Sequence, residues 1–326
     1  MQMVSKWIVA AGAVASLFAS MGASQAQQTI RVGWTIPAEE SKYWMMRRPE
    51  QFPDLGKTYK VEWTQFQGTA PMTQALAAGA LDCATQAPLS LANGVVGGNL
   101  KAYIVAQHVF EKPGGFSVYW AVMDNSPIKT IADLKGKTVG ISVIGGGTQG
   151  PLNMLLKQNG VDPAKDIKLV EVGFAVSEDA LRQGRVDAVN MNQPFAARAE
   201  AKGGTRKLFS LSQAMPNIVH ILEACRADFV DKNPDLVRAY VRDITLGMKK
   251  ALADRNGTLK VVNEVLKAPI PVLDTYLLKD NDFGRDPGAA PNFPAIQKML
   301  DIYHDAGMLP KMDVAQFKGP ITAPIQ

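Results

Sequence analysis

The clearest candidate for a binding site is a run of glycines between a predicted strand and a predicted helix. It reads Gly-Gly-Gly-Thr-Gln-Gly over residues 145–150, and Pro151 opens the helix. Backbone N–H groups at a helix start attract anions, with roughly 0.3–1 kcal/mol for each contact. The run also fits the spacing G-x-G-x-x-G, with Glu171 placed as a ribose-binding acid would be. An anion site, a dinucleotide site and a plain turn are the three interpretations, and we favour the anion site.

Small and polar residues also gather at the predicted carboxyl ends of the other strands. In parallel α/β sheets, ligands lie beyond these ends. The loops are rich in Thr, Ser, Asn, Gln and Gly and hold no nucleophile–base pair, which favours binding over turnover. The G-x-S-x-G elbow of serine hydrolases is also missing from the sequence. The predicted ligand-binding residues are Trp34, Thr35, Gln67, Gly68, Thr69, Gln86, Ala87, His108, Gly146, Gly147, Thr148, Gln149, Phe174, Asn192 and Gln193.

Histidine and cysteine are scarce. His108, His220 and His304 are far apart and lack the spacing of metal ligands, so we expect neither a metal nor a cofactor. The two cysteines, Cys83 and Cys225, are too few for a disulfide scaffold. They could pair or remain buried thiols, and the sequence leaves both outcomes open.

The elements that must position these residues alternate between strands and helices from Thr29 onward, which indicates an α/β architecture with parallel sheets. Residues 75–82 and 180–187 both read A-L-x-x-G-x-[LV]-D. Each octet describes a helix end, a glycine suited to positive φ, and the start of a strand. Equivalent strands precede both octets, so we expect two lobes of similar build.

The first residues have the layout of a secretory signal peptide. Lys6 precedes an apolar run at 7–18, and Ser-Gln-Ala at 24–26 is a small-x-small cleavage pattern. We predict a signal peptide over 1–26 and a mature protein in the periplasm. No cysteine follows the apolar run, so we expect no lipid anchor.

Composition excludes several classes of protein. Of the 326 residues, 47% are hydrophobic and 20% charged, which is typical of a folded, soluble chain. No apolar run reaches the roughly 18–20 residues of a membrane span. The net charge of +5 comes from scattered basic residues, whereas nucleic-acid binding needs a basic stripe. We therefore expect no nucleic-acid partner and a mild preference for anions.

Several short motifs are ordered along the mature chain in the same way as in a known family. The sequence resembles the periplasmic substrate-binding proteins of ABC importers, and more closely the nitrate/sulfonate/taurine and thiamine-precursor group. The residues that carry the resemblance are 74–82, 131–140, 184–188, 193–195, 228–230 and 233–235.

The resemblance implies an α/β fold of two lobes, the type II periplasmic-binding-protein fold, in which each lobe is a mainly parallel sheet flanked by helices. Lobe 1 would comprise 27–124 plus 213–326, and lobe 2 would comprise 125–212. Two crossing strands, at 117–123 and 218–224, would join the lobes. The family's strand order would also place Cys83 and Cys225 on adjacent antiparallel strands, where a disulfide could form.

The resemblance further implies a non-enzymatic function. The protein would be a monomer that captures a small organic solute and delivers it to an ABC permease. The helix start at 145–150 and the positive net charge favour an anion, such as a sulfonate or a carboxylate, as that solute. The lack of Arg and Lys in the other predicted loops keeps a neutral heteroaromatic solute, such as a pyrimidine, as an alternative. Further alternatives are a receptor-linked sensor, a precursor synthase, and a periplasmic oxidoreductase that uses 145–150.

One segment departs from the family pattern. After the first strand the family has a Gly-rich helix, whereas residues 43–49 are bulky and basic here. Arg47 and Arg48 could pair with an anionic ligand, and solvated surface charges are the simpler interpretation.

Overall fold

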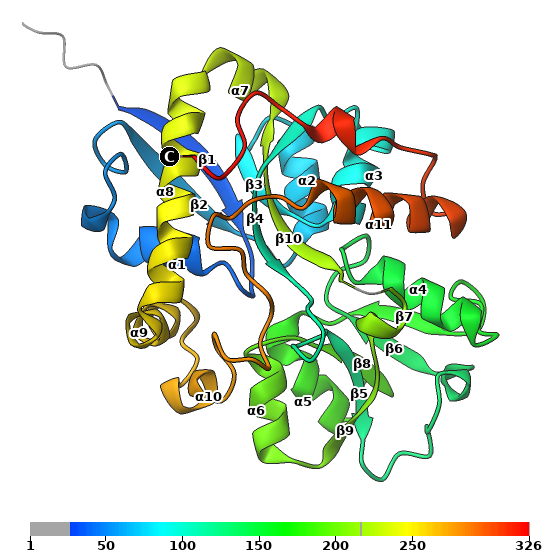
Figure 1. The fold of residues 1–326 in the computed structure, drawn as a ribbon. Coiled ribbons are helices and arrows are strands. Elements are labelled where there is room, and N and C mark those ends of the chain that lie inside the picture. Colours follow the sequence, from blue (N-terminus) through cyan, green and yellow to red (C-terminus); the bar gives the residue numbers. More distant parts are fainter. Residues whose placement is uncertain (1–26, 216, 326) are drawn as a thin grey trace, which may run out of the picture.

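The computed structural model describes residues 27–215 and 217–325, and the predicted signal peptide lies outside them. The chain forms two five-stranded sheets, each flanked by helices (Figure 1). The predicted two-lobed α/β fold is therefore confirmed. None of the described helices is long and apolar enough to cross a membrane.

The first sheet has the strand order β2-β1-β3-β10-β4. Strand β1 runs parallel to β2 and β3, whereas β10 runs antiparallel to both of its neighbours. The strands are β1 (Gln28–Trp34), β2 (Tyr59–Gln65), β3 (Cys83–Gln86), β4 (Ala102–Phe110) and β10 (Val219–Arg226).

The second sheet repeats this plan with the order β7-β6-β8-β5-β9. Strand β6 runs parallel to β7 and β8, and β5 is the antiparallel insertion between β8 and β9. The strands are β5 (Tyr119–Met123), β6 (Thr138–Ile141), β7 (Lys168–Glu171), β8 (Ala188–Met191) and β9 (Thr205–Ser210).

The repeated octet has the same physical role in both sheets. The backbone N–H of its aspartate, Asp82 or Asp187, donates to the carbonyl of a residue on the first strand of its sheet, Arg31 or Thr138. In return, the carboxylate of each aspartate accepts a hydrogen bond from the backbone N–H of that residue, at 2.9 Å for Arg31 and 2.8 Å for Thr138. The octet therefore aligns the first and third strands of each lobe.

Helices cover both faces of the first sheet. Helices α1, α8 and α9 share one buried core with β1, whereas α2, α3 and α11 pack in another core that continues into the second lobe. The apolar face of α8, which includes Tyr240 and Met248, is buried. The helices of this lobe are α1 (Glu40–Arg47), α2 (Thr69–Ala77), α3 (Pro88–Gly98), α7 (Ala227–Lys232), α8 (Pro234–Ala253), α9 (Arg255–Leu266), α10 (Ile270–Asp274) and α11 (Phe293–Asp305).

Three short helices flank the second sheet, and several 3-10 turns complete the structure. The helices are α4 (Gln149–Gln158), α5 (Ser177–Arg182) and α6 (Phe195–Lys202). The 3-10 turns are η1 (Pro49–Gln51), η2 (Ala132–Leu134), η3 (Phe174–Val176), η4 (Leu211–Gln213) and η5 (Val314–Phe317).

The described chain crosses between the sheets twice, at 111–118 between β4 and β5, and at 211–215 with 217–218 between β9 and β10. The two crossings are hydrogen-bonded to each other. The Glu111 N–H donates to the Ile218 carbonyl and the Leu211 N–H donates to the Val118 carbonyl, both at 2.8 Å. Because β5 pairs with β8 and β9, the first crossing precedes it. The predicted division into 27–124 plus 213–326 and 125–212 stays a proposal, and this pairing favours an earlier first boundary.

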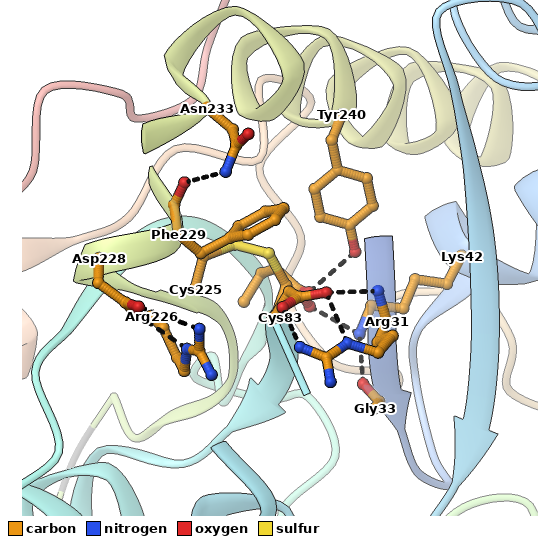
Figure 2. Close-up of a disulfide and its surroundings, with 12 residues drawn as sticks. Arg31, Gly33, Lys42, Cys83, Cys225, Arg226, Asp228, Phe229, Asn233 and Tyr240 are labelled. Carbon is orange, nitrogen blue, oxygen red and sulfur yellow. Dashed lines mark hydrogen bonds and ion pairs between the residues drawn. A yellow bond between two sulfur atoms is a disulfide. The ribbon is translucent and has the colours of Figure 1, made fainter. Parts of the chain in front are cut away.

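A disulfide joins Cys83 and Cys225 in the first lobe (Figure 2). The two residues are register partners on the antiparallel strands β3 and β10, as the family's strand order implies. Both are fully buried. The bond therefore joins the strand of the first octet to the strand that returns from the second lobe.

We predict that the double variant Cys83→Ala/Cys225→Ala loses about 2–5 kcal/mol of unfolding free energy, because the unfolded chain is no longer cross-linked. Urea unfolding measures this loss. A thiol titration of the oxidised wild-type protein in urea is the direct check, and it should find no free thiol. Two free thiols would contradict the bond.

Candidate ligand cleft between the lobes

A cleft opens between the two lobes beside the crossings. It encloses about 400 Å³ of empty space, part of it open to solvent, and Gly147 of the second lobe lies against Ala87 of the first. The lobes are therefore nearly closed on each other. The lining residues are Thr35, Ile36, Pro37, Gly68, Thr69, Ala87, Ser142, Val143, Gly146, Gly147, Thr148, Phe174, Asn192, His220 and Ile221.

Most of these residues follow the carboxyl ends of parallel strands. Thr35 follows β1, Ser142 follows β6 and Asn192 follows β8. Two helices also begin at the cleft: Thr69 is the first residue of α2, and Thr148 is the N-cap of α4. Since helix N-termini carry partial positive charge, both helices favour an anion between the lobes.

Three buried polar groups in the cleft have no hydrogen-bond partner among the described residues. They are the Thr69 and Thr148 hydroxyls and the Asn192 amide Nδ2. Thr69, Thr148 and Asn192 are 6%, 5% and 1% exposed. All three groups can donate a hydrogen bond, and leaving such a group unpaired costs about 1–3 kcal/mol. The residues that line the cleft therefore hold three donors, from both lobes, whose acceptor the described residues do not supply.

The charge of the lining is as informative as its donors. None of the lining side chains is an acid, an arginine or a lysine, and His220 is the one that titrates. Burial lowers the pKa of His220 to about 4, so the imidazole is neutral at pH 7. No group of three or more His, Cys, Asp or Glu in the described part of the chain could hold a metal ion.

The glycine run does not have the geometry of a dinucleotide site. The Glu171 carboxylate accepts from the Ile144 N–H at 2.7 Å, and the Gln149 side chain accepts from the Gly145 N–H at 2.5 Å. Both side chains therefore brace the loop itself, and Glu171 does not project toward a ribose. The run contributes Gly146, Gly147 and Thr148 to the cleft.

Glycines allow the two lobes to meet. A Cβ on Gly147, from the second lobe, would lie 2.5 Å from the Ala87 Cβ of the first lobe. A Cβ on Gly68 would lie 2.8 Å from the Val143 side chain, and one on Gly150 would lie 2.7 Å from the Tyr303 ring. A Cβ atom does not come this close to a carbon atom to which it is not bonded, so larger residues at these positions would hold the lobes apart.

The structure brings nine of the predicted ligand residues to the cleft and places six elsewhere. The residues in the lining are Thr35, Gly68, Thr69, Ala87, Gly146, Gly147, Thr148, Phe174 and Asn192. The residues outside it are Trp34, Gln67, Gln86, His108, Gln149 and Gln193. Their ligand-binding roles remain predictions for the first set and lose their geometric support for the second.

His108 was predicted to bind the ligand from its place in the sequence near a strand end, but the structure places it in the core. Its ring lies in the core of the first lobe, 3.1 Å from the Ser41 hydroxyl and 3.3 Å from the Glu223 carboxylate. Lys42 binds the same Glu223 carboxylate at 2.6 Å, and all three charged or titratable side chains are fully buried. Although burial alone would raise the pKa of Glu223, Lys42 and His108 lower it. His108 is thus part of a structural network.

The other misplaced side chains are held by contacts within their own lobes. Trp34 packs edge-on against Tyr43, with ring centroids 5.9 Å apart. Gln86 accepts from the Thr73 hydroxyl at 2.6 Å, and Gln193 accepts from the Ala197 N–H at 3.2 Å. Gln67 differs from these residues, because its side-chain oxygen faces the other lobe, where a Cβ on Gly173 would lie 3.1 Å from it.

Sequence reasoning missed Ile36, Pro37, Ser142, Val143, His220 and Ile221. His220 and Ile221 lie on β10, which is antiparallel, so a search of parallel strand ends does not find them. Both residues come just after the segment that leads from the second lobe back to the first, and this position in the sequence could have pointed to the cleft. Arg47 and Arg48 bind Glu264 of α9 instead of a cleft ligand.

We predict that Gly147→Val opens the lobes and weakens binding of any solute held in the cleft by about tenfold or more, since overpacking costs 1–3 kcal/mol. Small-angle X-ray scattering should show a larger radius of gyration. Gly97→Ala is the control, because a Cβ on Gly97 meets nothing within 4 Å. Unchanged scattering and affinity in Gly147→Val would show that the cleft does not need this contact.

Known proteins share both the sequence pattern and the fold. Residues 59–257 match the family described as NMT1/THI5 like. An Escherichia coli (strain K12) protein named for binding aliphatic sulfonates is 24% identical over 91% of this chain and 90% of its own length. The alkanesulfonate-binding protein SsuA of Xanthomonas axonopodis pv. citri, solved bound to MOPS, is 19% identical with a TM-score of 0.72, covering 89% of this chain and 98% of that chain.

The nitrate-binding protein NrtA of Synechocystis PCC 6803 has the same fold, with 16% identity and a TM-score of 0.69 over 89% of this chain and 84% of that chain. The likeness covers both lobes in each case, in agreement with the two repeated sheets. The predicted resemblance is confirmed: this chain belongs to the NMT1/THI5-like family and has the two-lobed fold of periplasmic binding proteins.

Proposed function

We propose that this protein captures a small organic anion, a sulfonate or a carboxylate, between its lobes and delivers it to an ABC permease. The observation that carries the proposal is the set of unpartnered donors in the cleft: the hydroxyls of Thr69 and Thr148 and the amide of Asn192. These donors belong to residues of both lobes that line one cleft, and an oxyanion has enough acceptor oxygens to serve all of them.

The helix termini add to this preference. Thr69 and Thr148 stand at the starts of α2 and α4, where the backbone also favours negative charge. Ile36, Pro37, Phe174 and Ile221 provide an apolar part of the lining. The cleft therefore suits a solute with a charged head group and a short apolar body.

The strength of these contacts is sufficient for capture. Hydrogen bonds to charged groups contribute about 1.5–3 kcal/mol each, so three of them supply much of the roughly −8 kcal/mol of a micromolar complex. Because the donors come from both lobes, the solute stabilises the closed form over the open one. A permease that recognises the closed form would receive only loaded protein.

Relatives support the same function. The named ligands of similar proteins include aliphatic sulfonates and nitrate, both oxyanions. We extend to this chain the periplasmic location of those proteins, a cleaved signal peptide over 1–26 without lipid attachment, and action as a monomeric, non-enzymatic subunit.

A neutral heteroaromatic solute, such as a pyrimidine, is the second candidate. The observation in its favour is that the lining lacks a permanently cationic side chain. Phe174 and the His220 ring could contact a flat ligand from two elements.

Thermal unfolding against alkanesulfonates, taurine, nitrate, carboxylates and pyrimidines separates the candidates. A ligand at 100 times its dissociation constant adds about 2.7 kcal/mol and raises the midpoint by a few degrees.

We predict that Thr148→Val weakens sulfonate binding about 10- to 100-fold, because it removes one donor to a charged group without changing the side chain's size. Isothermal titration calorimetry with butanesulfonate measures the change. Thr64→Val is the matched control, because Thr64 is exposed on β2, outside the cleft. Equal affinity of Thr148→Val and the wild type would remove this hydroxyl from the binding site.

A further inference from the structure

His220 is the one titratable side chain in the lining of the cleft. It lies on β10, directly after the second crossing between the lobes. Its ring stacks on Phe283, with centroids 5.3 Å apart and planes 21° apart, and Phe283 packs edge-on against Phe116 of the first crossing. Aromatic packing therefore fixes the ring where the cleft meets the crossings.

No charged group compensates His220 in the described structure. The acids and bases nearest along the packed elements are Asp282 and Arg285 beside Phe283, Glu111 at the first crossing, and Glu223 on β10 itself. Asp282 and Arg285 bind each other, and Glu223 binds Lys42. Burial is the only cause of the lowered pKa of His220, so these groups neither stabilise nor destabilise its charged form appreciably.

A solute anion would change this balance. His220 lines the same cleft as Thr69, Thr148 and Asn192, so an anion bound to their unpartnered donors lies in the cleft that His220 borders. In its neutral form the ring offers one N–H, and in its protonated form it offers two and a positive charge. A negative charge within about 4–6 Å of the ring would favour its protonated form.

We propose that His220 takes up a proton when the lobes close on an anion, and thereby supplies the positive charge that the rest of the lining lacks. This inference rests on the proposed function, because it requires an anionic solute. His220 then determines specificity: it favours anions over neutral solutes of the same shape, and it favours them more strongly in acid.

The sign of the pH dependence follows from linkage. The bound anion raises the pKa of His220 above its value of about 4 in the free protein. Affinity for the anion is therefore constant at alkaline pH and rises as the pH falls through the raised pKa. A neutral solute gives no such rise, because protonation of His220 in its presence still places an uncompensated charge in a buried site.

Butanesulfonate is the probe, because it stays ionised at every pH of the experiment and any proton taken up must come to the protein. Calorimetry of the full mature protein at pH 8, 7, 6 and 5, in buffers of different ionisation enthalpy, gives the affinity and the number of protons bound. We expect the affinity to rise about tenfold or more from pH 8 to pH 5, with proton uptake approaching one.

Three variants assign the proton. His220→Asn keeps a polar side chain without titration, and it should abolish both the rise and the uptake. His304→Asn is the matched control, because His304 lies on α11 and contacts the Leu309 carbonyl, outside the cleft. Glu111→Gln tests the other candidate, since burial raises the pKa of that carboxyl at the crossing to about 7. Both of these variants should retain the rise.

Each other result overturns the inference. Wild-type protein that binds butanesulfonate equally at every pH, without proton uptake, excludes a proton on His220 and leaves the proposed function intact. A rise that survives in His220→Asn and disappears in Glu111→Gln places the proton at the crossing. Absence of binding to every sulfonate and carboxylate at every pH overturns the proposed function together with this inference. If His220→Asn does not fold, the wild type and Glu111→Gln still test the inference: no rise in the wild type, or a rise that is lost in Glu111→Gln, excludes the proton on His220.

Discussion

Closing the two lobes buries hydrogen-bond donors that the protein does not satisfy by itself. The Thr69 and Thr148 hydroxyls and the Asn192 amide are left without partners inside the described structure. An unpaired buried donor costs about 1–3 kcal/mol, so a closed, empty cleft is penalised and a closed, filled cleft is not. Because of this constraint, a bound solute shifts the equilibrium from the open form to the closed form.

The rest of the molecule makes that shift possible. The crossings, at 111–118 and at 211–215 with 217–218, are hydrogen-bonded to each other, so the lobes can rotate about a defined joint. Glycines at 68, 147 and 150 let backbone approach side chain across the cleft, so that closure is complete enough to bury the donors. A larger residue at any of these points would leave the donors in contact with water and weaken the link between solute and shape.

The placement of charged side chains also favours capture of a solute in the cleft. The first lobe buries Lys42, Glu39, Glu223 and His108, but pairs them with one another away from the cleft. The cleft itself holds neutral donors and one uncharged imidazole. A permanently charged arginine or lysine would bind small inorganic anions as well. Neutral donors favour a solute whose shape satisfies all of them together.

Much of this arrangement could be predicted from sequence, and the remainder depended on tertiary structure. The two A-L-x-x-G-x-[LV]-D octets predicted the repeated lobes, because the aspartate and the glycine of each octet have local roles that spacing reveals: Gly79 and Gly184 have φ of +71° and +67°. Strand-end loops led to Thr69, Thr148 and Asn192, which the structure places in the lining of the cleft, and their role in binding stays a prediction. The sequence could not show that His108 lies in the core and that His220 lines the cleft. The surroundings of each ring depend on how β10 pairs with β4 in the folded sheet. The glycine run was expected to cradle an anion with its backbone, whereas the structure also gives it a steric role at the lobe contact.

The most direct test of the account is a crystal structure of the protein with butanesulfonate. The account predicts a closed form in which sulfonate oxygens lie within hydrogen-bond distance of Thr69 Oγ1, Thr148 Oγ1 and Asn192 Nδ2. A bound sulfonate elsewhere, or one in the cleft that leaves these three atoms unpartnered, would contradict the claim that unsatisfied donors drive the capture.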